Sequence, residues 1–209
     1  MNTSDKFTIT IGRQFGSGGR VIGRAIAQAL GIEFYDKALL QEAARHAGIN
    51  PELFERKDEK APSFFSGIMS LNMGYSSYPL FPGTSSISDD SLYRAQSEVI
   101  RALADRSSCV IVGRSADYAL RDRDNVVNIF IHAPLEECVK RIIERGDAET
   151  PEQARQLAEK TNKLRSAYYN FYTDKHWGHA SSYDLTIDSS KMSVEDIVSL
   201  VRLYLQLRR

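Results

Sequence analysis

Residues 8–27 have the sequence TITIGRQFGSGGRVIGRAIA, and this stretch decides the fold. The β-branched run TITI predicts a buried β-strand, and VIGRAIA has the apolar spacing of an amphipathic helix. A glycine-rich turn lies between them. Glycine lets the backbone fold tightly, so that successive N–H groups face one anion, and the helix that follows directs the positive end of its dipole to the same point. The stretch therefore predicts a site for nucleotide phosphates.

The candidate phosphate-binding residues are Arg13, Gly16, Ser17, Gly18, Gly19, Arg20 and Val21. In the common motif G-x-x-x-x-G-K-[ST], the lysine reaches the phosphates and the hydroxyl residue binds Mg²⁺. Alignment on GSG puts Arg13 at the first glycine, Gly19 at the lysine and Arg20 at the hydroxyl residue. With one residue inserted, Arg20 takes the lysine position and Val21 the metal position. Neither alignment gives an intact motif, and a glycine turn without a ligand is the alternative, although the flanking arginines favour a ligand site.

Length and charge limit the class of protein. The chain has 209 residues, which predicts one domain with a sizeable core. Its 27 Lys and Arg balance 27 Asp and Glu, so no general surface for nucleic acid or membrane is expected. No signal peptide or long apolar run is present, which favours a cytoplasmic protein. Cys109 and Cys138 show no CxxC spacing and are expected to be buried thiols.

Strand and helix patterns alternate along the chain. Strands are expected at residues 7–12, 33–35, 109–113, 126–131 and 184–187. Helices are expected at 20–30, 36–47, 90–105, 135–145 and from Thr150 to about 172, with a last helix that starts at Ser193. The alternation predicts an α/β fold with a parallel sheet. Residues 61–89 have no steady period, and we expect either a lid or binding loop there or a surface loop without fixed structure.

A second candidate cluster follows the strand at 109–113, where Arg114 would emerge at the carboxyl edge of the sheet. Ligands bind at that edge in open α/β sheets, and arginine suits bidentate contact with a phosphate. Asp117 lies one turn further on and is a candidate to hold a metal-bound water or to orient Arg114. The alternative is a structural Arg–Asp pair at the end of a strand.

Cations also mark the helices beyond residue 135. Arg141 and Arg145 are four residues apart and share a helix face, and Arg165 follows on the next helix. A mobile helix with several cations would suit a lid that closes on a transferring phosphoryl group, whereas a solvated charged helix is the alternative. His176 and His179 lack further ligands at metal-binding spacing, so no metal site made of protein side chains is expected.

Together these residues resemble the cytidylate kinase-like family, among the P-loop kinases of nucleosides and small molecules, over most of the chain. GSG at 16–18 resembles the phosphate loop of that family, and VGR at 112–114 resembles its D-G-R-D stretch, whose arginine contacts the acceptor nucleotide. Glu159, Asn162 and Arg165 fall where the family has a lid motif of the type R-D-x-x-D-x-x-R. The chain departs from the family at the loop lysine and serine and at several of these acids.

The resemblance implies a P-loop kinase-type three-layer sandwich around a five-stranded parallel sheet, with an acceptor-binding insertion at about 37–105 and a lid at about 145–180. It implies transfer of the γ-phosphoryl group of ATP to a nucleoside monophosphate, CMP or dCMP first, so that the partners are small-molecule nucleotides and the cofactors ATP and Mg²⁺. A kinase of another small acceptor and a module that binds nucleotides without transfer remain as alternatives. No oligomeric state follows from the sequence.

On this hypothesis each candidate residue has a role. Arg20 would replace the missing lysine, while the backbone of residues 13–20 would hold the donor phosphates. Arg114 would bind the acceptor phosphate, and Asp36 and Asp117 would shape the acceptor site. Arg141 and Arg165 would close on the transferring group. Mg²⁺ would be held mainly by ATP oxygens and water, with help from Ser17 or Asp117.

Overall fold

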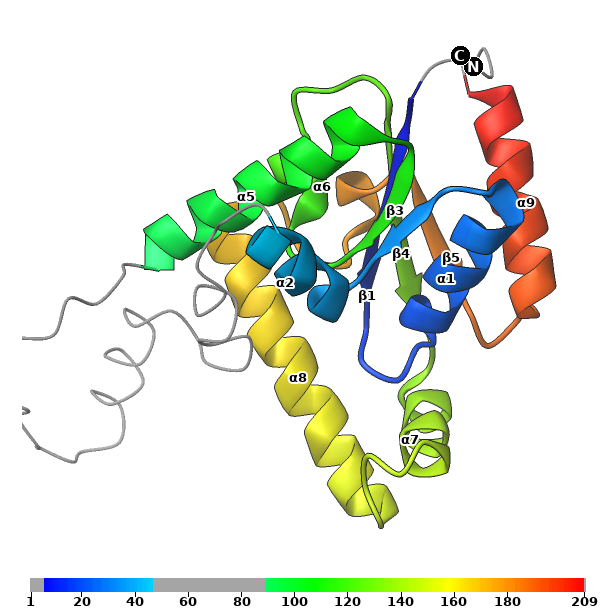
Figure 1. Cartoon of the computed structure of the whole chain (residues 1–209). Helices are drawn as coiled ribbons and strands as arrows, with labels where there is room; N and C mark the ends of the chain where they lie inside the picture. The colour runs from blue at the N-terminus through cyan, green and yellow to red at the C-terminus, as the bar shows by residue number, and fades with distance from the viewer. Residues whose placement is uncertain (1–5, 47–88, 209) are drawn as a thin grey trace, which may run out of the picture.

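Five parallel strands form one sheet, in the order β2-β3-β1-β4-β5, within residues 6–46 and 89–208, which the computed structural model describes (Figure 1). They are β1 Thr8–Arg13, β2 Glu33–Tyr35, β3 Cys109–Val112, β4 Val126–His132 and β5 Leu185–Asp188. β1 is the central strand, where Ile9 pairs with Val110 of β3 and with Val127 of β4. All three side chains are fully buried. The glycine-rich turn after β1 therefore leaves the sheet at its middle.

Helices cover both faces of the sheet. α1 Gly19–Leu30 and α9 Val194–Leu207 pack on one face, while α2 Lys37–His46, α5 Asp89–Arg106 and α6 Ala116–Ala119 pack on the other. Each face is closed by its own aliphatic cluster, and full burial of one such side chain stabilises the fold by about 1.5–3 kcal/mol. This arrangement confirms the predicted α/β fold, in which a five-stranded parallel sheet lies between two layers of helices.

A helical pair extends beyond the sheet. It consists of α7 Leu135–Glu144 and α8 Pro151–Tyr172. Figure 1 shows α8, in yellow, running past the carboxyl ends of the strands to reach α7. Ile142 of α7 and Ala154 and Ala158 of α8 are fully buried in the small core between the two helices. This core holds one long helix across the mouth of the site described below.

Capping residues set the ends of several helices. Thr150, where the sequence predicts the helix to begin, accepts a hydrogen bond from the Gln153 N–H and forms a capping box at the start of α8. Ser193 forms another with Asp196 at the start of α9. Gly31 ends α1 with a φ of +65°, a left-handed conformation that glycine adopts without strain. These local signals explain why the predicted helix boundaries lie close to the observed ones.

Some expectations differ from the structure or fall outside it. The strand predicted at 184–187 runs from Leu185 to Asp188, and α6 is not expected from the sequence because four residues show too little periodicity. Residues 61–88 of the expected lid or binding loop lie outside the described residues, as does most of the insertion expected at 37–105. That insertion, the lid at 145–180 and the single-domain assignment stay predictions. None of the described helices is both long and apolar enough to cross a lipid bilayer.

Candidate functional site

The glycine-rich turn is packed tightly against α7. Gly16 and Gly18 have φ values of +81° and +79°, which glycine adopts readily. A Cβ at Gly16 would lie 2.7 Å from the Cys138 carbonyl oxygen, so the close approach of α7 also requires glycine there. Ser17 is fully buried, and its hydroxyl donates a hydrogen bond of 2.9 Å to the Gln14 carbonyl. The turn is thus held in one shape by its own bonds and by α7.

Arg141 anchors this turn from below. Its guanidinium donates to the Ser17 carbonyl at 3.1 Å and to both Oγ and the carbonyl oxygen of Ser189, each at 2.9 Å. The Ser189 hydroxyl in turn donates to the Ser17 carbonyl at 2.6 Å. Arg141 therefore ties the turn to the segment after β5. Its expected contact with a transferring phosphoryl group stays a prediction.

A cavity of about 430 Å³ lies at the carboxyl ends of β1 and β3. Its walls come from the ends of these strands, from α8 and from the segment between α8 and β5. The cationic side chains on its lining are Arg13, Lys37, Arg114 and Arg165, and the aromatic ones are Phe15, Tyr168, Tyr169, Trp177 and Tyr183. A space lined by both cations and aromatic rings fits a ligand that carries both phosphate and an aromatic base.

The turn after β3 presents Arg114 to this cavity in a strained conformation. Gly113, Arg114 and Ser115 have successive φ values of +81°, +61° and +48°. Left-handed backbone at a residue other than glycine is unfavourable by roughly 1–3 kcal/mol, and such strain gathers at functional sites. The strain therefore supports a functional role for the predicted residue Arg114.

The long helix α8 forms hydrogen bonds directly with the segment that opens the glycine-rich turn. Asn162 Oδ1 accepts a hydrogen bond of 2.7 Å from the Phe15 N–H, and Arg165 donates to the Arg13 carbonyl at 3.2 Å. The guanidinium carbons of Arg145 and Arg165 lie 5.3 Å and 5.5 Å from the centre of the Phe15 ring. Two residues that resemble the lid motif, Asn162 and Arg165, thus meet the expected phosphate loop.

Asp117 is buried on the cavity wall and pairs with α8. The Tyr169 hydroxyl donates a hydrogen bond of 2.6 Å to Asp117 Oδ2. Burial raises the pKa of Asp117, and the bond from Tyr169 acts in the opposite direction. Burial also raises the pKa of Tyr169, and so does the negative charge of Asp117. The carboxylate thus has a partner that the sequence did not indicate, because Tyr169 lies 52 residues away.

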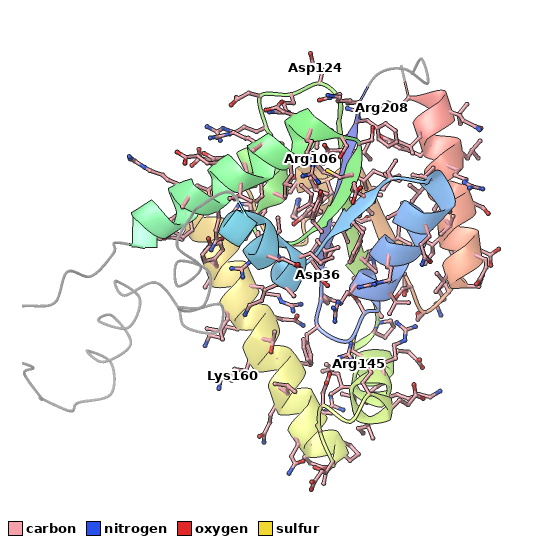
Figure 2. The ribbon with its side chains drawn as sticks, viewed as in Figure 1. Asp36, Arg106, Asp124, Arg145, Lys160 and Arg208 are labelled. Atoms are coloured by element: carbon pink, nitrogen blue, oxygen red, sulfur yellow. The ribbon has the colours of Figure 1, made fainter. Side chains whose placement is uncertain are left out.

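Arg20 and Asp36, predicted for the donor and the acceptor side, are bound to each other. Nε and Nη2 of Arg20 both lie 2.7 Å from Asp36 Oδ2, while Asp36 Oδ1 accepts from the Leu39 N–H and caps α2. Figure 2 shows Asp36 beside the start of α2. The Arg20 side chain is 66% exposed, and that of Asp36 is 7% exposed. The described cavity is lined by other residues, and Val21 is also exposed.

The described residues offer few protein ligands for a magnesium ion at this site. No group of three or more His, Cys, Asp or Glu side chains gathers in residues 6–46 and 89–208. Asp117 and Asp147 are the carboxylates on the cavity lining, and Asp147 pairs with Arg145 at 2.6 Å. The Ser17 hydroxyl is turned to the Gln14 carbonyl. These donors suit an ion held mainly by phosphate oxygens and water.

The sequence of this chain is similar to those of known cytidylate kinases. The family model described as "Cytidylate kinase-like family" matches residues 8–191. A curated cytidylate kinase of Pyrococcus horikoshii is 25% identical over 199 residues, which cover 95% of this chain and 88% of that protein. A cytidylate kinase of Methanopyrus kandleri is also 25% identical, and the match covers 93% of this chain and 90% of that protein.

Solved structures give the same picture of the fold. An uncharacterized protein from Eubacterium ventriosum has a TM-score of 0.71 and 27% identity, and the match covers 97% of this chain and all of that one (100%). Shikimate kinase from Acinetobacter baumannii, in complex with shikimate, has a TM-score of 0.51 and 17% identity, with 97% of this chain and 95% of that one covered. The latter likeness concerns the fold alone and confirms the predicted P-loop kinase-type architecture.

Proposed function

The chain belongs to the cytidylate kinase-like family, and from this premise we propose that it transfers the γ-phosphoryl group of ATP to a nucleoside monophosphate, with CMP and dCMP as the first candidates. Membership of the family supports a kinase of a nucleotide or another small molecule. The choice of a nucleoside monophosphate as acceptor is the proposal.

One observation carries this proposal. Three elements far apart in the sequence each bring an arginine to one cavity beside the glycine-rich turn: Arg13 at the end of β1, Arg114 after β3 and Arg165 on α8. Phosphoryl transfer requires positioning and neutralisation of charge more than covalent help from the protein. Converging guanidinium groups supply both, because each binds phosphate oxygens in a fixed planar geometry.

The reaction needs no acid or base from the protein. A phosphate oxygen of the acceptor forms a bond to the γ-phosphorus of ATP, while the bond from that phosphorus to the bridging oxygen of ADP breaks. The acceptor leaves as a nucleoside diphosphate and the donor leaves as ADP. A phosphate monoester with a second pKa near 6 is largely dianionic at neutral pH, so no proton must be removed before attack. Mg²⁺, when bound, would neutralise charge on the donor phosphates.

A kinase of another small acceptor is the second candidate, and one observation favours it. Asn162 and Ser115 stand where the family motifs have acids. Asn162 Oδ1 already accepts from the Phe15 N–H, so this oxygen is engaged with the turn. A cytidine-binding arrangement that relies on those acids would therefore have to be replaced by other groups.

The test is ADP formation from Mg²⁺–ATP with CMP, dCMP, UMP, AMP and GMP, compared with a reaction that lacks an acceptor. Turnover that depends on one monophosphate is expected and would identify the acceptor. ATP binding without turnover on any monophosphate would overturn the proposal and leave another acceptor or a binding module. For the arginine variants described below, Arg24→Ala is the control, because Arg24 is an exposed arginine of α1 that lies over the Phe34 ring.

A further inference from the structure

Arg13 and Gly19 compete for one space. A Cβ added at Gly19 would lie 2.6 Å from Cβ and 3.1 Å from Cγ of Arg13. Real side chains do not approach so closely, so the stem of Arg13 fills the volume in which a side chain at position 19 would begin. In the alignment on GSG, position 19 is the one at which the common motif carries its lysine. With the Arg13 stem in this place, glycine is the residue that fits at position 19.

A second glycine makes room for the far end of the same side chain. A Cβ added at Gly113 would overlap Nη1 of Arg13 and would lie 2.8 Å from its Cζ. Gly113 begins the strained turn that presents Arg114. The side chain of Arg13 therefore runs from the end of β1, past Gly19, to the end of β3, and it lines the cavity along this path.

The backbone at Arg13 is fixed as well. Its carbonyl accepts from Arg165, and the next N–H, that of Gln14, donates to the Ile131 carbonyl at 3.0 Å. A side chain that leaves an anchored backbone and is guided by two glycines has a defined direction before any ligand binds. Such preorganised charge stabilises a transferring group without reorganisation at the moment of reaction.

We propose that the Arg13 side chain is the loop cation of this protein: it contacts the β- and γ-phosphates of ATP in place of the lysine missing at position 19. This inference rests on the proposed function and names a residue that acts in it. Arg20 is less suited to the task, because its guanidinium is bound to Asp36 and its side chain is 66% exposed. Arg13 and Gly19 form a reciprocal pair: the common motif has glycine at the first position and a cation at the second, whereas this chain has the cation at the end of β1 and the glycine at the start of α1.

The first test removes the charge and keeps the stem. Arg13→Met retains the methylene groups that pack at Gly19, and we expect it to lower kcat/KM for ATP by about 100-fold, the effect of losing one donor to the developing charge. Arg20→Ala is expected to lower it less than Arg13→Met does. Thermal unfolding of each variant reports whether the fold is kept. If folded Arg13→Met keeps more than about a third of the wild-type activity, the proposal is wrong.

The second test exchanges the two positions. Gly19→Lys alone places a side chain on top of Arg13, and we expect it to lose activity at least as severely as Arg13→Met. The double variant Arg13→Gly with Gly19→Lys restores the common arrangement and is expected to exceed Gly19→Lys alone by about tenfold or more. A double variant no better than Gly19→Lys would overturn the reciprocal relationship.

A binding measurement separates this inference from the proposed function. Inorganic tripolyphosphate is the probe, and its Kd is measured for the wild type, Arg13→Met and Arg24→Ala. We expect Arg13→Met to weaken binding about tenfold or more and Arg24→Ala to leave it unchanged. If the wild type turns over no acceptor, the proposed function fails while this arm still decides on Arg13. Equal affinity of wild type and Arg13→Met would overturn the inference even if the enzyme is active.

Discussion

The hydroxyl of Tyr169 on α8 donates a hydrogen bond of 2.6 Å to the buried carboxylate of Asp117, which follows the strained turn after β3. This bond joins the long helix to the edge of the sheet at which the cavity lies. A buried acceptor that loses its partner destabilises the fold by about 1–3 kcal/mol. Tyr169→Phe is therefore expected to lower the free energy of unfolding by that amount, as measured by urea denaturation. An unchanged free energy of unfolding would contradict it, and Tyr204→Phe on α9 is the control.

The same carboxylate predicts a pH dependence of stability. Burial raises the pKa of Asp117 above its ordinary value of 3.8, so the folded state keeps this proton to a higher pH than the unfolded state does. Its contribution to stability is therefore fully present below pH 3.8 and is lost as the pH rises through the folded pKa. Asp117→Asn removes this dependence. The Tm of the wild type relative to that of Asp117→Asn is expected to fall as the pH rises above 3.8, and parallel profiles would refute the assignment.

Arg141 predicts an effect on the loop rather than on the reaction itself. Arg141→Met removes three hydrogen bonds to Ser17 and Ser189, so we expect a loss of roughly 1–3 kcal/mol in the free energy of unfolding. We also expect a rise in KM for ATP. Arg145→Met, one helical turn away, removes an exposed pair with Asp147 and the contact with the Phe15 ring, and it is expected to lose about 1 kcal/mol or less. Equal destabilisation by the two variants would show that Arg141 does not anchor the loop.

Gly16 predicts a steric effect that a matched glycine can isolate. Gly16→Ala brings a Cβ to 2.7 Å from the Cys138 carbonyl, whereas Gly31→Ala, also at a positive φ, meets nothing within 4 Å. Both variants place an L side chain at a positive φ, which is unfavourable by roughly 1–2 kcal/mol. Gly16→Ala is expected to exceed Gly31→Ala by a further 1–3 kcal/mol, from displacement of well-packed atoms. Chemical denaturation measures both, and similar values would mean that α7 yields to the added methyl group.

A substitution at Arg114 is expected to affect the KM of the acceptor and of ATP differently. Because it lines the cavity from the end of β3, we expect Arg114→Lys to raise KM for the acceptor by about tenfold while changing KM for ATP much less. Lysine keeps the charge but loses the planar, bidentate contact with phosphate. Steady-state kinetics with each substrate varied in turn provide the measurement. An equal rise in both KM values would place Arg114 with the donor instead.

Much of the fold could be predicted from local signals in the sequence. The capping box of Thr150 and the terminal glycine at Gly31 act within a few residues, and the helices that they bound begin and end close to the predicted positions. The apolar runs of β1, β3 and β4 predicted these strands equally well, because parallel strands covered on both faces need such runs. Four-residue α6 has no comparable signal.

The site was predictable only in part. Arg114 and Arg165 were expected at the site and do line the cavity, because a strand end and a lid motif are visible in the sequence; their roles stay predictions. The pairing of Arg20 with Asp36 was not expected, since it depends on how α1 lies against the end of β2. The path of Arg13 past Gly19 was not predicted either, because it depends on how the start of α1 lies against the end of β1. A glycine at the lysine position was the signal that another side chain fills its space.

The central position of β1 has a consequence for synthesis of the chain. β1 is made first, yet Thr8 must wait for Cys109, 101 residues later, before one of its edges is paired, and β4 covers the other edge later still. At about 5–20 residues per second, the ribosome needs roughly 5–20 s to supply β3. During that interval a β-branched strand has both edges open to other chains. The strand before the glycine-rich turn is thus open to aggregation through both of its edges while the rest of the sheet is still being made.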